Sequence, residues 1–199
     1  MRPDRLIIVF LLIFLAGCGY TVRNLDSEGK EIICFGDSIT AGVGAPEGKD
    51  YASFLSALLG KDVLNAGVRG DTTQNALKRL KKDVLSKDPY LVIVELGGND
   101  FLQKVPREVT LRNLKKIISR IQGQGVMVAL ADLSCGLILK GYRKDFKKLA
   151  RDSGSIFIPN LLKEILNKPS LKYDYIHPNE DGYKIMAERV YRAIKNYVK

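Results

Sequence analysis

A serine and a histidine in this chain stand in segments where they could carry out nucleophilic chemistry. Ser38 closes the sequence Gly36-Asp37-Ser38, and His177, the only histidine, follows Asp174 by three residues. A histidine can take the proton of a serine hydroxyl, and a carboxylate that bonds its other ring nitrogen fixes the tautomer and stabilises the imidazolium. These residue types indicate acyl transfer, with Ser38 as nucleophile and His177 as general base oriented by Asp174.

Two further segments offer groups that could stabilise an oxyanion. The run 65–72 contains Gly67 and Gly70, and glycines in such a turn can present backbone N–H groups. Asn99 carries an uncharged amide with two N–H donors. Taken singly, each segment also fits a structural role, because glycine, aspartate and asparagine are favoured in turns and helix caps. A lone histidine without a cysteine cluster makes a poor metal site, so no metal is expected.

These segments must be positioned by a sheet, since short apolar runs alternate with amphipathic stretches. The expected strands are Ile32–Phe35, Val63–Asn65, Leu91–Leu96, Val126–Ala131 and Ile156–Ile158. The expected helices are Tyr51–Leu59, Thr73–Ser86, Pro106–Gln122, Tyr142–Asp152 and Asn179–Tyr197. This alternation predicts an α/β fold, a three-layer α/β/α sandwich around a five-stranded parallel sheet of flavodoxin-like order 2-1-3-4-5. Open parallel sheets carry their sites at the carboxyl ends of the strands, where Ser38, Gly70 and Asn99 would lie.

Length and composition indicate one ordinary folded domain. A chain of 199 residues has room for a single α/β domain, and 46% hydrophobic with 27% charged residues excludes a disordered chain. The net charge of +10 would suit nucleic acid or an anionic membrane surface. No zinc-finger spacing, aromatic RNA-binding motif or basic tail accompanies it, so no nucleic-acid partner is expected. Solvated helix faces, such as the run Lys78-Arg79-Lys81-Lys82, are the first interpretation, and mild attraction to anionic lipid is the second.

The N-terminus has the pattern of an export signal. Arg2 and Arg5 precede an apolar run from Leu6 to Ala16, which is too short to cross a bilayer. The segment Leu15-Ala16-Gly17-Cys18 resembles a bacterial lipobox, which implies cleavage before Cys18 and its lipidation. We therefore expect a signal peptide over residues 1–17, a lipidated tether over 18–29 and a domain over 30–199. A plain signal peptide or a short uncleaved anchor are the alternatives.

Two cysteines remain in the domain. Cys34 falls in the first expected strand and Cys135 just after the fourth. These strands are not neighbours in the expected order, which exceeds the reach of a disulfide. We expect both thiols to be unpaired and largely buried.

Four segments taken together resemble the SGNH (GDSL) hydrolase family. They are Gly-Asp-Ser at 36–38, the glycine-containing turn at 65–70, Gly-Gly-Asn-Asp at 97–100 and Asp-x-x-His at 174–177. The stretches 65–80 and 91–100 are most similar to the thioesterase I/lysophospholipase L1 (arylesterase) branch, and the resemblance covers about residues 31–199. It implies Ser38, Asp174 and His177 as the catalytic triad. It also implies an oxyanion hole formed by the N–H groups of Ser38 and Gly70 and by the Asn99 side chain, with Gly70 selected over Gly67.

The resemblance implies a serine esterase or thioesterase that acts through an acyl-enzyme and requires no metal or organic cofactor. Its expected substrates are aryl esters, lysophospholipids or acyl thioesters, and an apolar loop around Leu137-Ile138-Leu139 could line an acyl groove. A carbohydrate O-deacetylase of the same family is one alternative, and a non-catalytic surface lipoprotein that binds lipid or glycan is another. With Cys18 lipidated, the protein would lie in the bacterial cell envelope outside the cytoplasm. A monomer is expected.

Overall fold

The fold is built on a sheet of five parallel strands, and the computed structural model describes it within residues 20–134 and 141–199. The strands are β1 (Glu31–Gly36), β2 (Val63–Gly67), β3 (Pro89–Glu95), β4 (Met127–Ala131) and β5 (Ile156–Ile158). Their order is β2-β1-β3-β4-β5, and every neighbouring pair is parallel. The predicted fold class and strand order are thereby confirmed. The predictions for Cys18, Cys135 and the 137–139 loop concern positions outside the described residues.

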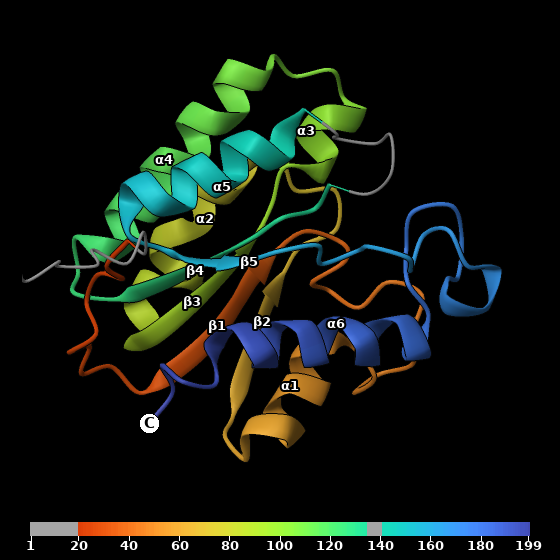
Figure 1. Cartoon of the computed structure of the whole chain (residues 1–199), viewed down its shortest axis with the longest axis horizontal. Helices are drawn as coiled ribbons and strands as arrows, with labels where there is room; N and C mark the ends of the chain where they lie inside the picture. Colours follow the sequence, from red (N-terminus) through yellow and green to blue (C-terminus); the bar gives the residue numbers. More distant parts are fainter. Residues whose placement is uncertain (1–19, 135–140) are drawn as a thin grey trace, which may run out of the picture.

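Helices cover both faces of the sheet, as the ribbon in Figure 1 shows. They are α1 (Tyr51–Leu59), α2 (Thr73–Asp83), α3 (Gly98–Leu102), α4 (Arg107–Gln122), α5 (Tyr142–Ser153) and α6 (Glu180–Ile194), with short 3-10 turns at Leu85–Lys87 and Pro169–Leu171. Helices α1 and α6 pack together on one face, and α2, α4 and α5 pack on the other. Because both faces are covered, all five residues of β4 are buried, which explains why the strands read as continuous apolar runs.

The expected helix boundaries agree with the structure to within one residue for α1, α4 and α5, and differ more for α2 and α6. The helix that begins at Thr73 ends at Asp83, because the backbone of Val84 leaves helical geometry and a 3-10 turn follows. The last helix begins at Glu180, capped by the Asn179 side chain, and ends at Ile194. Helix α3 was not predicted, since five residues are too few to establish a hydrophobic period. This short helix carries Asn99.

Residues 20–29, the described part of the predicted tether, lie against the domain. The Tyr20 hydroxyl donates to the Ser155 carbonyl at 2.6 Å, and the Arg23 N–H donates to the Gly154 carbonyl at 2.9 Å. The Asn24 amide donates to two backbone carbonyls, at Gln122 and Val126, both at 2.9 Å. These bonds hold the segment at the amino ends of β4 and β5. Within the described ranges, no helix combines the length and hydrophobicity needed to cross a bilayer.

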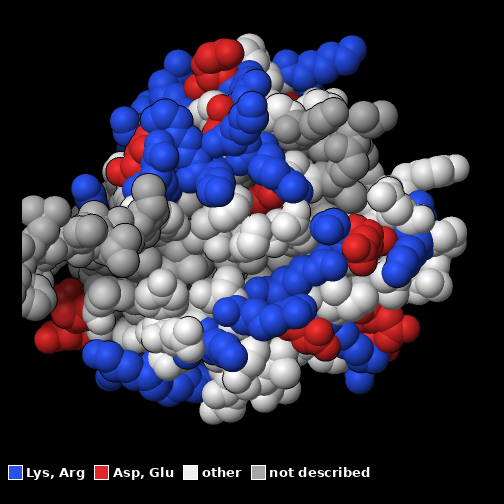
Figure 2. Space-filling model, viewed as in Figure 1, with Lys and Arg blue, Asp and Glu red and all other residues white. Residues whose placement is uncertain are grey.

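Charged side chains are unevenly spread over the face drawn in Figure 2. Lys and Arg gather over α5 and along α6, with a paler band of uncharged residues between them. Part of the basic surplus is therefore concentrated on one side of the molecule. The expectation of solvated helix faces holds for Lys78, Lys81 and Lys82, which are exposed, and is wrong for Arg79, which is half-buried.

Cys34 lies in the middle of β1, fully buried and unpaired. Burial is the largest of the influences that raise the pKa of its thiol. A buried protonated thiol behaves as a small apolar side chain. The expectation of an unpaired, buried thiol is confirmed for Cys34.

Glu95, the last residue of β3, places a carboxyl group in the core beneath the turn that follows β1. Its Oε2 accepts a hydrogen bond from the Thr40 hydroxyl at 2.6 Å, whereas Oε1 has no partner among the described residues. A Cβ on Gly36 would lie 2.6 Å from that Oε2, so the carboxyl group occupies space that only glycine leaves open. Burial, followed by the nearby Asp37 carboxyl, raises the pKa of Glu95 well above its usual range. The site favours the neutral acid.

Replacing Glu95 by glutamine tests this protonation state. Glu95→Gln keeps the shape and an acceptor for Thr40 but cannot ionise. In the unfolded wild type, Glu95 ionises above its ordinary pKa, whereas in the fold it stays protonated. The wild type therefore loses stability as pH rises from about 4.5 towards the folded pKa. We expect the free energy of unfolding, measured by urea titration, to depend less on pH in Glu95→Gln than in the wild type between about pH 5 and 8.

Asp37, whose pKa is also raised by burial, to about 6, should leave a smaller residual slope in the Glu95→Gln variant. The exposed Glu28→Gln serves as the control and should keep the wild-type slope. An unchanged slope in Glu95→Gln would mean that the buried carboxyl is ionised in the fold.

Candidate active site

The turn after β1 presents Ser38 at the carboxyl edge of the sheet. The Asp37 carboxylate accepts the N–H of Ile39 at 3.0 Å, and the Asp37 carbonyl accepts the N–H of Ala41 at 2.9 Å. The turn is therefore closed by the residue before the serine, which leaves the Ser38 side chain directed outward. Asp37 thus holds the turn by its own hydrogen bonds.

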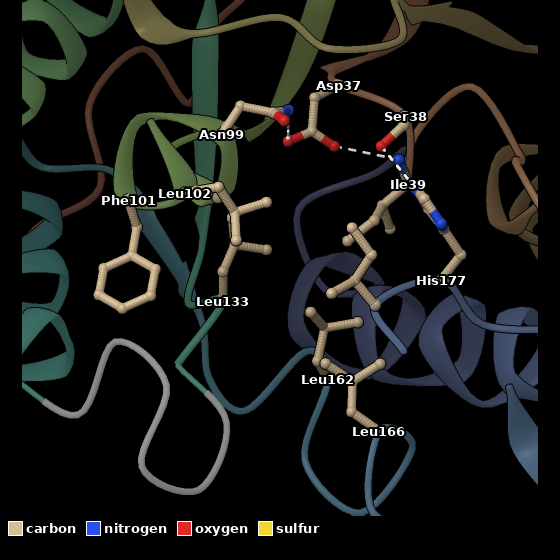
Figure 3. Close-up of a pocket in the computed structure, with 12 residues that line it drawn as sticks. Asp37, Ser38, Ile39, Asn99, Phe101, Leu102, Leu133, Leu162, Leu166 and His177 are labelled. Atoms are coloured by element: carbon tan, nitrogen blue, oxygen red, sulfur yellow. Dashed lines mark hydrogen bonds between the residues drawn. The ribbon is translucent and has the colours of Figure 1, made fainter. Parts of the chain in front are cut away.

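Ser38, His177 and Asp174 form a continuous hydrogen-bonded chain. His177 Nε2 lies 2.9 Å from Ser38 Oγ, a contact drawn in Figure 3, and His177 Nδ1 lies 2.7 Å from Asp174 Oδ2. The other oxygen of Asp174 accepts the backbone N–H groups of Ile176 at 2.9 Å and His177 at 2.8 Å. Partial burial acts to raise the pKa of Asp174, but these hydrogen bonds from His177 and Ile176 outweigh it and lower the pKa. An ionised carboxylate is thus fixed behind the imidazole.

The loop before α6 is folded so that Asp174 and His177 point the same way. Lys172 and Pro178 form an antiparallel bridge, and the Tyr173 N–H donates to the His177 carbonyl at 2.9 Å. The Asn179 cap then starts α6 by accepting the N–H of Gly182 at 3.1 Å. The spacing of three residues therefore becomes a direct contact through a closed loop that precedes the helix.

Gly67, the last residue of β2, and Gly70, in the turn that follows, occupy different environments. A Cβ on Gly67 would lie 2.2 Å from the Ala41 nitrogen, so Gly67 allows the turn after β1 to approach β2 closely. Gly70 has a φ of +77° and open space around it, which places it at the exposed turn itself. Among the described residues, the N–H groups of Ser38 and Gly70 have no hydrogen-bond partner. Both remain available for an oxyanion.

Asn99 lies on α3, directly behind the serine turn. Its amide nitrogen donates to Asp37 Oδ2 at 2.9 Å and to the Asp71 carbonyl at 3.1 Å. Figure 3 shows Asn99 facing Asp37 across the upper end of the pocket. Both amide hydrogens are thus engaged in this structure, so a substrate oxygen must share or replace one of these two bonds. The Asp37–Asn99 contact was not foreseen, because the two residues are far apart in the sequence.

Arg79 connects three of the segments that make up the site, a role the sequence analysis missed. Its guanidinium lies 4.4 Å from the centre of the Phe35 ring. It donates to the carbonyls of Gly36 and Ala66, both at 2.9 Å, and to Asp71 Oδ2 at 2.5 Å. Arg79 therefore fixes the ends of β1 and β2 and the turn that carries Gly70. The helical spacing could have indicated this role, because Arg79 follows Ala76 by three residues and therefore lies on the same, buried side of α2.

Buried hydrogen bonds also fix the start of α2 against α3. The side chain of Asp100, which is fully buried, accepts the Thr73 N–H at 2.8 Å and the Thr73 hydroxyl at 2.5 Å. The Asn113 amide donates in turn to the same hydroxyl at 3.1 Å. Since Asp100 follows Asn99, this network sets the position of the Asn99 side chain.

An apolar cavity of about 100 Å³ opens beside Ser38 and His177. Its wall is made mainly of aliphatic and aromatic side chains (Figure 3), namely Ile39, Phe101, Leu102, Leu133, Leu162, Leu166 and Ile176. Within the described part of the chain, no group of three or more His, Cys, Asp or Glu is arranged to hold a metal ion. The cavity can bury an aliphatic chain while its polar end meets the serine.

Comparisons with known proteins agree with this geometry. Residues 34–185 match the family described as GDSL-like Lipase/Acylhydrolase. An arylesterase of Vibrio mimicus is 32% identical over 193 residues, which cover 90% of this chain and 95% of that protein. The thioesterase 1/protease 1/lysophospholipase L1 of Escherichia coli strain K12 is 27% identical, with 84% of each chain covered.

Two further proteins extend the comparison. An uncharacterized lipoprotein of Bacillus subtilis strain 168, YqeF, is 31% identical and covers 69% of this chain and 59% of its own length. The crystal structure of AlinE4, an SGNH-hydrolase family esterase, superposes with a TM-score of 0.65 at 31% identity, covering 86% of this chain and 95% of that one. The chain belongs to the GDSL-like lipase/acylhydrolase family and is an ester-hydrolysing serine hydrolase.

Proposed function

We propose that Ser38, His177 and Asp174 hydrolyse acyl esters through an acyl-enzyme. The observation that carries this proposal is the 2.9 Å contact between Ser38 Oγ and His177 Nε2, backed by the 2.7 Å contact between His177 Nδ1 and Asp174. His177 takes the hydroxyl proton as Ser38 attacks the carbonyl carbon, and returns it to the leaving alcohol or thiol. Water, deprotonated by His177, then attacks the acyl-enzyme and releases the acid and free Ser38.

The oxyanion formed in each step is stabilised by three donors. They are the N–H groups of Ser38 and Gly70 and the Asn99 amide, which turns one of its two hydrogens from Asp37 or Asp71 towards the substrate. The open turn at Gly70 supports this assignment, as does the anchoring of that turn by the Arg79–Asp71 ion pair at 2.5 Å. Each such donor typically contributes on the order of 100-fold to turnover.

The acyl group of the substrate is an aliphatic chain of short to medium length. The apolar wall of the cavity supports this choice, because such a wall can bury an aliphatic acyl chain. Arylesterase and thioesterase relatives are consistent with acyl esters or thioesters as the class. A carbohydrate O-deacetylase is the alternative, and it would favour acetyl sugars over longer acyl esters.

The enzyme acts in the bacterial cell envelope, anchored by a lipid on Cys18. The Leu15-Ala16-Gly17-Cys18 sequence and the lipoprotein among its relatives support this location. The domain would then begin within a few residues of the membrane surface.

Ser38→Ala removes the nucleophile with little change in volume. We expect hydrolysis of p-nitrophenyl butyrate to fall by about 1,000-fold or more, with unfolding temperature close to that of the wild type. Activity is measured by release of p-nitrophenol. The exposed Ser86→Ala should retain wild-type activity. Full activity in Ser38→Ala would contradict the assigned nucleophile.

Leu166→Trp places a larger side chain at a half-buried position in the cavity wall and so reduces the space in the cavity. We expect kcat/KM for p-nitrophenyl octanoate to fall about tenfold or more, while kcat/KM for the acetate ester changes little, because only the longer chain needs the filled space. Chain-length profiles of the two proteins give the comparison. Leu58→Trp, on the exposed side of α1, should leave the profile unchanged. Equal losses on acetate and octanoate in Leu166→Trp would show that this wall does not contact the acyl chain.

A further inference from the structure

The chain joins the described domain close to the proposed anchor. Tyr20 and Arg23 are hydrogen-bonded to the carbonyls of Ser155 and Gly154 at the start of β5. Only Gly19 lies between Cys18 and Tyr20, and the two residue steps from Cys18 to Tyr20 span at most about 7 Å when extended. This inference rests on the proposed lipidation of Cys18. With that lipid inserted in the bilayer, the domain surface around Tyr20 must lie against the headgroups.

A basic groove adjoins Tyr20. It has a volume of about 680 Å³ and runs between α5 and the end of α6 over β5. Four cations, Lys144, Lys147, Lys148 and Arg151, line it, and the lining within the described residues includes no acidic side chain. The other walls are apolar or aromatic, with the Tyr20 and Tyr197 rings at its border. Tyrosine suits such a border because its ring is apolar and its hydroxyl is polar.

A second groove continues the first along α6. The two share Phe157 and Ala193, and the second adds Lys163, Arg189 and Arg192 against the single acid Glu164. Figure 2 shows the resulting bands of basic side chains over α5 and α6 on one face of the molecule. The cations thus lie on α5, on α6 and in the loop after β5, and form a broad surface.

Acidic neighbours neutralise only part of this charge. Asp152 contacts both Lys148 and Arg151, and Glu188 contacts Arg192. Lys144 and Lys147 are exposed and have no acidic partner among the described residues. The surface therefore keeps a positive field after its internal ion pairs are counted.

We propose that this face, formed by α5, β5, the C-terminal half of α6 and Tyr20, docks on the headgroups of an anionic bilayer. The short distance to Cys18 and the positive charge point to the same side of the molecule, and they are independent observations. A lysine or arginine near an anionic membrane typically strengthens binding about fivefold.

The proposed face and the acyl cavity share the loop that follows β5. Lys163 lines the second groove, and its neighbours in the same loop, Leu162 and Leu166, line the cavity next to Ser38. The loop after β5 thus contacts the bilayer side with one set of residues and the substrate pocket with another.

The experiment compares two triple variants of the full chain. Lys144→Gln/Lys147→Gln/Arg192→Gln removes three charges from the proposed face, and Lys78→Gln/Lys81→Gln/Lys82→Gln removes three exposed charges from α2. Partition is measured by sedimentation onto vesicles of phosphatidylcholine, with and without phosphatidylglycerol. For each variant we divide the partition coefficient on vesicles with phosphatidylglycerol by the coefficient on vesicles without it. Residues 1–19 are the same in all variants, so comparing this ratio between variants cancels their contribution.

We expect that ratio to fall on the order of 100-fold in the α5/α6 variant and to change much less in the α2 variant. Hydrolysis of p-nitrophenyl butyrate should stay at the wild-type level in both, which shows that the variants fold. An unchanged ratio in the α5/α6 variant, or an equal fall in both variants, would overturn the docking face. The docking face would also be overturned if the α5/α6 variant kept a high ratio but lost binding to a single-stranded oligonucleotide. None of these outcomes depends on Ser38, so loss of the esterase mechanism would be recognised separately.

Discussion

The hydrogen bond between His177 Nε2 and Ser38 Oγ joins segments that are 139 residues apart, and the remaining structure serves to make it possible. Ser38 follows strand β1, whereas His177 precedes α6, which packs with α1 on one face of the sheet. Their meeting therefore requires the order β2-β1-β3-β4-β5, the covering helices and the closed loop 172–178. A parallel sheet supplies such a meeting point because all its carboxyl ends lie on one edge.

Around this contact, buried polar groups hold the turns rigid. Arg79 fixes the ends of β1 and β2, and Asp100 joins α2 to α3. Beneath Ser38, the carboxyl group of Glu95 is sealed in the core and favours its neutral form. Buried groups of this kind are costly when unpaired and rigid when paired. These buried polar groups therefore lie beside the turns whose positions must be accurate for attack on a carbonyl.

The sequence was sufficient to predict the sheet, its order and the segments that approach one another. Strands β3 and β4 are buried on both faces, so their apolar runs were unambiguous. Helix α3 was missed because five residues carry no period, and with it the contact between Asn99 and Asp37. Arg79 was predicted to be solvated, because arginine is usually exposed. Only its spacing from the buried residues of α2 indicated that it faces inward. Interactions between residues distant in sequence, such as Glu95 with Thr40, leave no local pattern to read.

The most direct test of the account is the mass of the trapped reaction intermediate. The enzyme is mixed with p-nitrophenyl hexanoate, quenched with acid within the first turnover, digested and analysed by mass spectrometry. We predict one hexanoyl group on the peptide that contains Ser38. An acyl group on another residue, or steady hydrolysis without any acyl group on Ser38, would contradict it.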